Sequence, residues 1–196
     1  GDRAGAVAEG VQATWIALGV GAVIVAVIYP LAPWVMRLMV GSSGPDAAHV
    51  AADAASWLRI ACFGVPLILV SMAGNGWMRG VQETRRPVVY VVVGLSIGAV
   101  LLVGLVHGVW FFPRLGLAGS AVANVVGQSI TGLLFAARLL REVLPEAGSH
   151  ALRPRWAVIR AQLVMARDLV TRSLSFQVCF LSAAAVAARF GVAAVA

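Results

Sequence analysis

The sequence predicts an all-α integral membrane protein built as a bundle of several helices. Of its 196 residues, 61% are hydrophobic and only 12% are charged, and the mean hydropathy is +0.92. A soluble domain is about 45–50% apolar and about 25% charged. A surface with so little charge could not keep so apolar a chain in water. The composition therefore argues against a soluble enzyme, a nucleic-acid-binding domain and a disordered tail.

Five charge-free runs predict the helices, because about 20 apolar residues are needed to cross about 30 Å of hydrocarbon. The runs are 10–36, 60–78, 87–113, 115–137 and 173–188. The first four are long enough to span a membrane. The fifth continues as an apolar run to Ala196, so we expect a helix that the end of the chain interrupts. Together with the polar start at Gly1, this predicts an internal piece of a longer protein.

Tryptophan positions agree with these limits, since tryptophan favours the membrane interface. Trp15 and Trp34 bracket the first run, and Trp57 and Trp77 bracket the second. At 1.5 Å per helical residue, the two separations are about 28 Å and about 30 Å. We therefore expect all four at the membrane boundaries and none in a buried core.

Arginine bias predicts the orientation. The chain has no lysine, and its 15 basic residues are all arginine. Alternating spans put 11 of them on one side: Arg3, Arg79, Arg85, Arg86, Arg138, Arg141, Arg153, Arg155, Arg160, Arg167 and Arg172. The other side, formed by loops 37–59 and 112–116, holds 3: Arg37, Arg59 and Arg114. Because cytoplasmic loops are rich in arginine and lysine, the N-terminal segment, loop 79–86 and connection 138–172 are predicted to be cytoplasmic.

The connection 138–172 is the one long polar segment. Residues 145–149 (PEAGS) are typical of a turn. In 155–171, apolar residues recur at helical spacing: Trp156, Ile159, Leu163, Ala166 and Val170. This pattern predicts a helix lying on the membrane surface. A cytoplasmic extension of the next spanning helix explains it equally well.

Four segments resemble, in order, motifs of the MATE multidrug exporter family. They are residues 1–4 (GDRA), 76–87 (GWMRGVQETRRP), 115–124 (LGLAGSAVAN) and 188–196 (ARFGVAAVA). They are similar to the approach to family helix three, the end of helix four, the entry to helix six and the end of helix seven. The resemblance covers essentially the whole chain and is closest to the DinF-like branch.

The resemblance implies a transporter bundle of twelve helices in two lobes, of which this chain holds one incomplete six-helix lobe plus the start of the second. Residues 1–142 would form helices three to six. Residues 143–172 would form a cytoplasmic inter-lobe linker with an amphipathic helix, and 173–196 the truncated first helix of the C-terminal lobe.

The implied function is a secondary-active antiporter, not an enzyme, in the cell membrane. It would export cationic or amphipathic small molecules by alternating access, coupled to H⁺ or Na⁺ and without a cofactor. Its partners would be membrane lipid, the small-molecule substrate and the remaining helices of the full-length chain, with no nucleic acid.

No acidic residue lies within a predicted span, although intramembrane charges usually mark transport sites. The eight acids are Asp2, Glu9, Asp46, Asp53, Glu83, Glu142, Glu146 and Asp168. The resemblance implies a coupling acid in helix one, which precedes this sequence. Some members carry another in helix five near an asparagine, but residues 91–98 (VVVGLSIG) have neither. The position of the coupling acid is therefore not given by this chain.

Polar uncharged residues supply the candidate substrate or ion path. Three recur every four residues on one helix: Ser120, Asn124 and Gln128. Beside this polar stripe runs a small-residue stripe: Gly119, Ala123, Gly127 and Thr131. Small residues allow close helix packing, so one edge should pack while the next faces a wet cavity. Asn75 and Gln177 are further candidates, and each of these amides could instead only hydrogen-bond a neighbouring helix.

Other interpretations are a flippase for lipid-linked precursors, from a related transporter family, and a non-transporting structural membrane subunit. Apart from Arg189 the spans are neutral, which argues mildly against a flippase with a cationic cavity. An intramembrane enzyme is disfavoured, because no HExxH or GxSxG motif occurs. Cys62 and Cys179 lack metal-site spacing and are predicted to be packing residues. His107, near the outer end of its helix, is a weak candidate for proton transfer.

Overall fold

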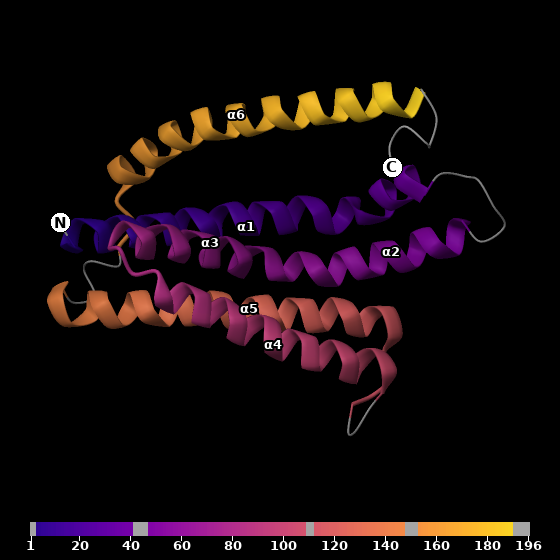
Figure 1. Ribbon diagram of the computed structural model, residues 1–196, viewed down its shortest axis with the longest axis horizontal. Helices are drawn as coiled ribbons and strands as arrows, with labels where there is room; N and C mark the ends of the chain where they lie inside the picture. Colours follow the sequence, from indigo (N-terminus) through magenta and orange to yellow (C-terminus); the bar gives the residue numbers. More distant parts are fainter. Residues whose placement is uncertain (1–2, 41–46, 109–111, 148–152, 190–196) are drawn as a thin grey trace. The chain divides into compact units, whose positions relative to one another are not determined.

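The computed structural model describes residues 3–40, 47–108, 112–147 and 153–189, and these residues contain no strand (Figure 1). The elements are α1 (Arg3–Val40), α2 (Ala47–Ala61), a short 3₁₀ helix η1 (Cys62–Gly64), α3 (Val65–Gly80), α4 (Arg85–His107), α5 (Gly116–Ala147) and α6 (Trp156–Arg189). They fall into two compact units, Gly1–Pro154 and Arg155–Ala196. The all-α class is confirmed.

Among the described residues, four helical stretches are long and apolar enough to cross a membrane: Gly5–Met39, Ala47–Gly80, Arg85–His107 and Gly116–Val143. They contain the first four predicted runs, apart from the end of the third and Leu115 at the start of the fourth. The second is longer than predicted, because residues 47–59, expected in a loop, belong to α2. This segment is rich in alanine, the strongest helix former. Residues 41–46 of the predicted loop lie outside the described set.

The third span is shorter than the predicted run to Pro113, because α4 ends at His107. Gly108 adopts a left-handed conformation with a φ of 69°, and its N–H donates to the Gly104 carbonyl at 2.9 Å. Glycine takes this conformation without steric cost, so it commonly ends helices. Apolar character alone could not reveal this stop.

The second unit is one continuous helix, α6, with no break near residue 172. Of the two explanations for 155–171, the helical extension matches this geometry. The fifth predicted span, 173–188, lies in the same helix, and the side chains of most residues after Phe180 lie outside the described set. The domain boundaries and this span therefore remain predictions.

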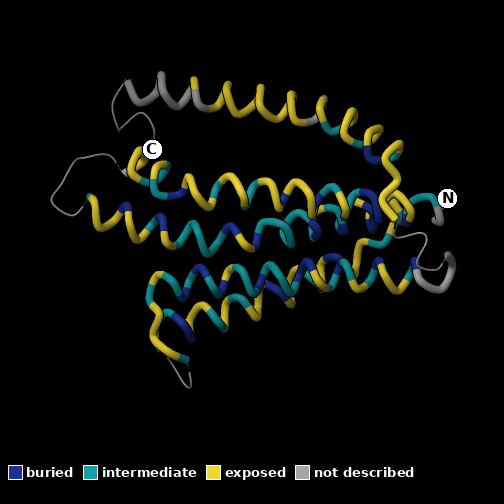
Figure 2. The backbone as a smooth tube through the Cα atoms, turned by 180° about the vertical axis from the view of Figure 1, so that it is seen from behind, coloured by how far each residue is buried: buried dark blue, intermediate teal, exposed yellow. Residues whose placement is uncertain are grey.

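In the first unit, α5 packs against all four of α1, α2, α3 and α4, and α1 packs against α2 and α3. The buried core lies at the end of the bundle that holds the turn 81–84, which we name the 81–84 end. Its members come from α1, α3 and α5: Val7, Val11, Trp77, Met78, Phe135, Leu139 and Val143. Figure 2 shows that α4, by contrast, is exposed along much of its length.

Trp77 belongs to this core, so the prediction that it lies outside a buried core is wrong. Its side chain is 6% exposed and lies against Gly10, where an added Cβ atom would come within 2.9 Å of the indole. Trp57 is also partly buried and hydrogen-bonded. Trp15 and Trp34 are exposed. Both tryptophans that bracket the first predicted run are therefore exposed, whereas the two that bracket the second are not, and the membrane-boundary position remains a prediction.

Helices α4 and α5 approach each other through glycines. A Cβ atom added to Gly127 would lie 2.9 Å from the Gly94 carbonyl oxygen and 3.0 Å from the Gly98 Cα. Both neighbours are backbone atoms and cannot rotate away. Ala123 is also buried, and an added Cβ on Gly119 would meet Leu105 of α4. The predicted small-residue stripe therefore packs against a neighbouring helix.

We expect Gly127→Ala to destabilise the protein by about 1–3 kcal/mol, because the new methyl group overpacks this contact. Gly76→Ala in α3 is the matched control, since no atom lies within 4 Å of its added Cβ. It should be neutral or slightly stabilising. Thermal unfolding of the purified whole protein measures both, and an unchanged melting temperature for Gly127→Ala would contradict the packing.

Candidate functional site

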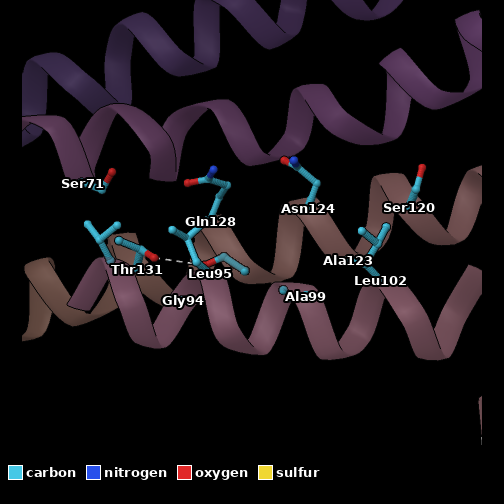
Figure 3. A pocket seen from close by; sticks show the side chains of 13 residues that line it. Ser71, Gly94, Leu95, Ala99, Leu102, Ser120, Ala123, Asn124, Gln128 and Thr131 are labelled. Atoms are coloured by element: carbon cyan, nitrogen blue, oxygen red, sulfur yellow. Dashed lines mark hydrogen bonds between the residues drawn. The ribbon is translucent and has the colours of Figure 1, made fainter. Parts of the chain in front are cut away.

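The packing of α4 on α5 fixes which way the polar stripe faces. With the small-residue stripe against α4, the side chains one position along the helix project toward the space between α3 and α4. Figure 3 shows Ser120, Asn124 and Gln128 extending from α5 in that direction. The structure therefore brings together three of the five predicted site residues.

A cavity of about 350 Å³ lies at this place, lined by α3, α4 and α5. Its polar lining consists of Ser71, Ser120, Asn124, Gln128 and Thr131. Its apolar lining comes chiefly from α4: Val91, Gly94, Leu95, Gly98, Ala99 and Leu102. The volume falls within the range of small-molecule sites, about 300–1,000 Å³.

Hydrogen bonds divide the polar lining into two kinds. Ser71 and Thr131 donate to carbonyl groups of their own helices, at 2.8 Å to Ile68 and 3.2 Å to Gly127. The side-chain amides of Asn124 and Gln128 have no hydrogen-bond partner among the described residues. An amide that is neither paired nor hydrated is costly in an apolar environment. These two amides are therefore the groups most available to a bound polar molecule or water.

Ser120 is held differently. Its Oγ accepts a hydrogen bond from Trp57 Nε1 of α2 at 2.9 Å and donates to the Leu117 carbonyl at 2.7 Å. The hydroxyl therefore links α2 to α5 beside the cavity. The sequence placed Trp57 at the membrane boundary, and nothing in its local spacing pointed to this long-range bond.

The cavity is neutral, because none of its lining residues is ionisable. Among the described residues, no group of three or more histidine, cysteine and acidic side chains could hold a metal ion. This lining can bind by hydrogen bonds and apolar contact. It offers no charged group of its own for exchanging an ion against a substrate.

The remaining predicted residues lie elsewhere. Asn75 lines a separate groove near the end of α3, and Gln177 is exposed on α6, in the second unit. His107 is exposed at the last residue of α4. Arg189 is the last residue of α6, and its side chain lies outside the described set.

Charged residues form a cluster at the 81–84 end that the sequence did not reveal. Glu83 in the turn pairs with Arg86 at 2.8 Å and lies 4.0 Å from Arg138 of α5, which also pairs with Glu142. Only the four-residue spacing of Arg138 and Glu142 was readable beforehand. A second missed group is Gln12, a buried side chain of α1 that donates to the Arg153 carbonyl at 3.1 Å.

Comparison with known proteins decides the family. The model of the family described as MatE matches residues 1–103. The chain belongs to the MATE family. Members of this family are transporters and not enzymes, and the four apolar helices agree with a multi-pass membrane protein.

Similar curated proteins include several MATE relatives. DNA damage-inducible protein F of Escherichia coli is 32% identical over 184 residues, which cover 92% of this chain and 38% of that protein. Probable multidrug resistance protein YoeA of Bacillus subtilis is 29% identical, over 65% of this chain and 26% of its own length. Probable multidrug resistance protein NorM of Deinococcus radiodurans is 35% identical, over 66% and 30%.

The chain therefore spans less than two fifths of the length of these MATE relatives. No solved structure matches it. The resemblance to the DinF-like branch is confirmed by the match to DNA damage-inducible protein F.

The link between Trp57 and Ser120 can be measured by a double-mutant cycle. We expect Trp57→Phe and Ser120→Ala to be non-additive in unfolding free energy, with a coupling of about 0.5–1.5 kcal/mol, typical of a hydrogen bond within a membrane protein. Thermal or denaturant unfolding of the whole protein supplies the four values. Pairing Trp57→Phe with Ser129→Ala, which does not line the cavity, should give additive effects. Additivity in the first cycle would contradict the bond.

Proposed function

We propose that the whole protein is a secondary-active exporter of cationic or amphipathic small molecules, coupled to H⁺ or Na⁺. Two lobes would rock around a central cavity in alternating access. The described cavity between α3, α4 and α5 would form part of the substrate path on one lobe. The names of two similar proteins, which describe probable multidrug resistance, support this class of substrate.

The observation that carries the proposal is the pair of unpartnered amides on a neutral, largely apolar wall. Asn124 and Gln128 can each donate and accept hydrogen bonds. The apolar face of α4 opposite them suits the hydrocarbon part of an amphipathic molecule. Binding by these means tolerates differences between substrates, because it does not require one fixed charge arrangement.

The coupling site of this exporter would lie outside the cavity wall described here. No acid lines the cavity, and the charged cluster of Glu83, Arg86, Arg138 and Glu142 lies at one end of the bundle. We propose that the coupling carboxylate belongs to a part of the whole protein outside this chain. The environment of that carboxylate would decide whether H⁺ or Na⁺ is the coupling ion.

In the cell, we propose that the protein lies in the plasma membrane with its 81–84 end in the cytoplasm. The asymmetric distribution of arginine supports this orientation. We also propose, from the resemblance to the MATE family, that 143–172 is a cytoplasmic linker between two lobes and that 173–196 begins the second lobe.

The substrate-path role predicts that Asn124→Leu lowers efflux without lowering the amount of folded protein. The change removes the amide but keeps a side chain of similar size. Efflux of a fluorescent cation from cells, normalised to the monodisperse protein recovered from membranes, measures the effect, and we expect at least a severalfold loss. Ser129→Ala is the control, because Ser129 does not line the cavity. Parallel loss of folded protein and efflux would instead indicate that Asn124 only joins helices.

The orientation predicts that Thr84→Cys reacts only from the inside of intact cells. Thr84 is exposed in the turn before α4, so its reactivity reports on sidedness. The measurement is labelling by a membrane-impermeant maleimide in a Cys179→Ser background, before and after permeabilisation. Cys62 is buried and can stay. Full labelling of intact cells would reverse the assigned topology.

A further inference from the structure

A second groove, of about 450 Å³, opens at the 81–84 end between the last turns of α3 and the first turns of α4. Its polar members are Asn75, Arg79 and Thr84. Its apolar members on α4 include Val88, Val91 and Val92. The groove therefore has a cationic, hydrogen-bonding end and an apolar wall that continues along a membrane-spanning helix.

The charge of Arg79 is not neutralised within the described residues. Its Nε donates to the neutral Asn75 Oδ1 at 3.1 Å, and its Nη groups have no partner there. Two nearby arginines differ, because Arg86 pairs with Glu83 and Arg138 pairs with Glu142. Glu83 and Glu142 are thus engaged by other cations, which leaves Arg79 facing the groove as an available positive charge.

Thr84 adds a hydrogen-bond donor to the same end. It directly precedes α4, yet its side chain does not cap the helix, and its hydroxyl has no partner among the described residues. A guanidinium with free N–H groups beside a free hydroxyl suits a phosphate ester, which offers several acceptor oxygens.

The apolar wall suits a hydrocarbon chain. The side chains of Val88 and Val92 are 62% and 54% exposed, although they lie on a helix apolar enough to cross the membrane. They are four residues apart on α4, about 6 Å along the helix axis. Arg79 and Thr84 lie at the helix ends, and the valines follow along α4 toward the membrane interior. This arrangement matches a phospholipid, whose phosphate lies at the membrane surface and whose acyl chain points inward.

We propose that this groove binds an anionic phospholipid, with its phosphate at Arg79 and Thr84 and one acyl chain along Val88, Val91 and Val92. Anionic lipid is favoured over zwitterionic lipid, because the exposed Arg85 next to Thr84 would repel a cationic headgroup. Basic pockets between spanning helices are suited to anionic headgroups. Val91 also lines the cavity between α3, α4 and α5, so the bound acyl chain would lie next to that cavity.

Native mass spectrometry of the whole protein in detergent, with phosphatidylglycerol or phosphatidylcholine added at equal concentration, tests the proposal. We expect the wild-type protein to retain phosphatidylglycerol preferentially. Arg79→Gln should weaken that binding about fivefold, the effect of one arginine near an anionic lipid. Arg141→Gln is the matched control, since Arg141 is exposed on α5 and does not line the groove, and it should leave binding unchanged.

A second pair of variants tests the apolar wall without altering charge. Val88→Trp should block the acyl chain and lower retention, whereas Val100→Trp, at an exposed position outside both cavities, should not. If Arg79→Gln lowers the melting temperature, its lost lipid binding could result from unfolding, and the comparison of Val88→Trp with Val100→Trp then tests the groove. An excess of glycerol 3-phosphate should fail to displace the lipid, because it lacks the acyl chain.

Three results would overturn the proposal: no preference for phosphatidylglycerol, equal losses in Arg79→Gln and Arg141→Gln, or displacement by glycerol 3-phosphate. The measurement reads lipid binding and not efflux, so its outcome is independent of the proposed transport function.

Discussion

The close backbone approach of α4 and α5 is the contact on which the rest of the candidate site depends. Gly127 meets Gly94 and Gly98 so closely that a single methyl group would collide with backbone. This contact sets the rotation of α5 about its axis. Residues four apart share one face of a helix, so Asn124 and Gln128 form one stripe next to the stripe of Gly127. Fixing the face that Gly127 presents to α4 therefore also fixes the direction in which this polar stripe faces. The polarity of the cavity is thus a consequence of glycine positions on the neighbouring stripe.

Solvation explains why the charges and the amides lie where they do. Within hydrocarbon, an unpaired polar group costs several kcal/mol. The described acids Glu83 and Glu142 accordingly lie at the 81–84 end, where each pairs with arginine. The uncharged Ser120 is satisfied by Trp57 and by its own helix. Asn124 and Gln128 face a cavity, where water or a ligand can supply the missing bonds.

The sequence predicted those features that depend on local pattern. Apolar runs indicated four spans, and the two stripes of α5 correctly indicated a packing edge beside a polar edge. Residues 47–59 were missed because charge at Asp53 and Arg59 suggested a loop, whereas alanine content decided for helix. Trp77 was wrongly expected outside the core, because its separation from Trp57 along the chain does not reveal that α1 covers it.

Partners distant in the chain were beyond the reach of pattern. The bond from Trp57 to Ser120 joins residues 63 positions apart, and Glu83 meets Arg138 across a helix pair. Both depend on how α2, α3 and α5 pack, which no local spacing encodes. Three of the predicted site residues, Ser120, Asn124 and Gln128, lie on one helix at four-residue spacing. That spacing made them predictable from the sequence, and it also places them side by side in the structure. Asn75 and Gln177 lie on other helices, α3 and α6, so no helical spacing related them to the three residues on α5.

The helices of the first unit differ in length, so they end at different levels on the side away from the 81–84 end. At 1.5 Å per residue, α4 is about 35 Å long, whereas the continuous stretch Ala47–Gly80 is about 51 Å and α1 about 57 Å. Since α3 and α4 share the 81–84 end, the excess length of the α2 side accumulates at the opposite end. The exposed Leu38 and Met39 lie on that raised part of α1. A bilayer of uniform thickness cannot match the lengths of both the shorter and the longer helices. Tilting of the longer helices, or cover by the rest of the protein, must therefore keep the exposed apolar end of α1 out of water.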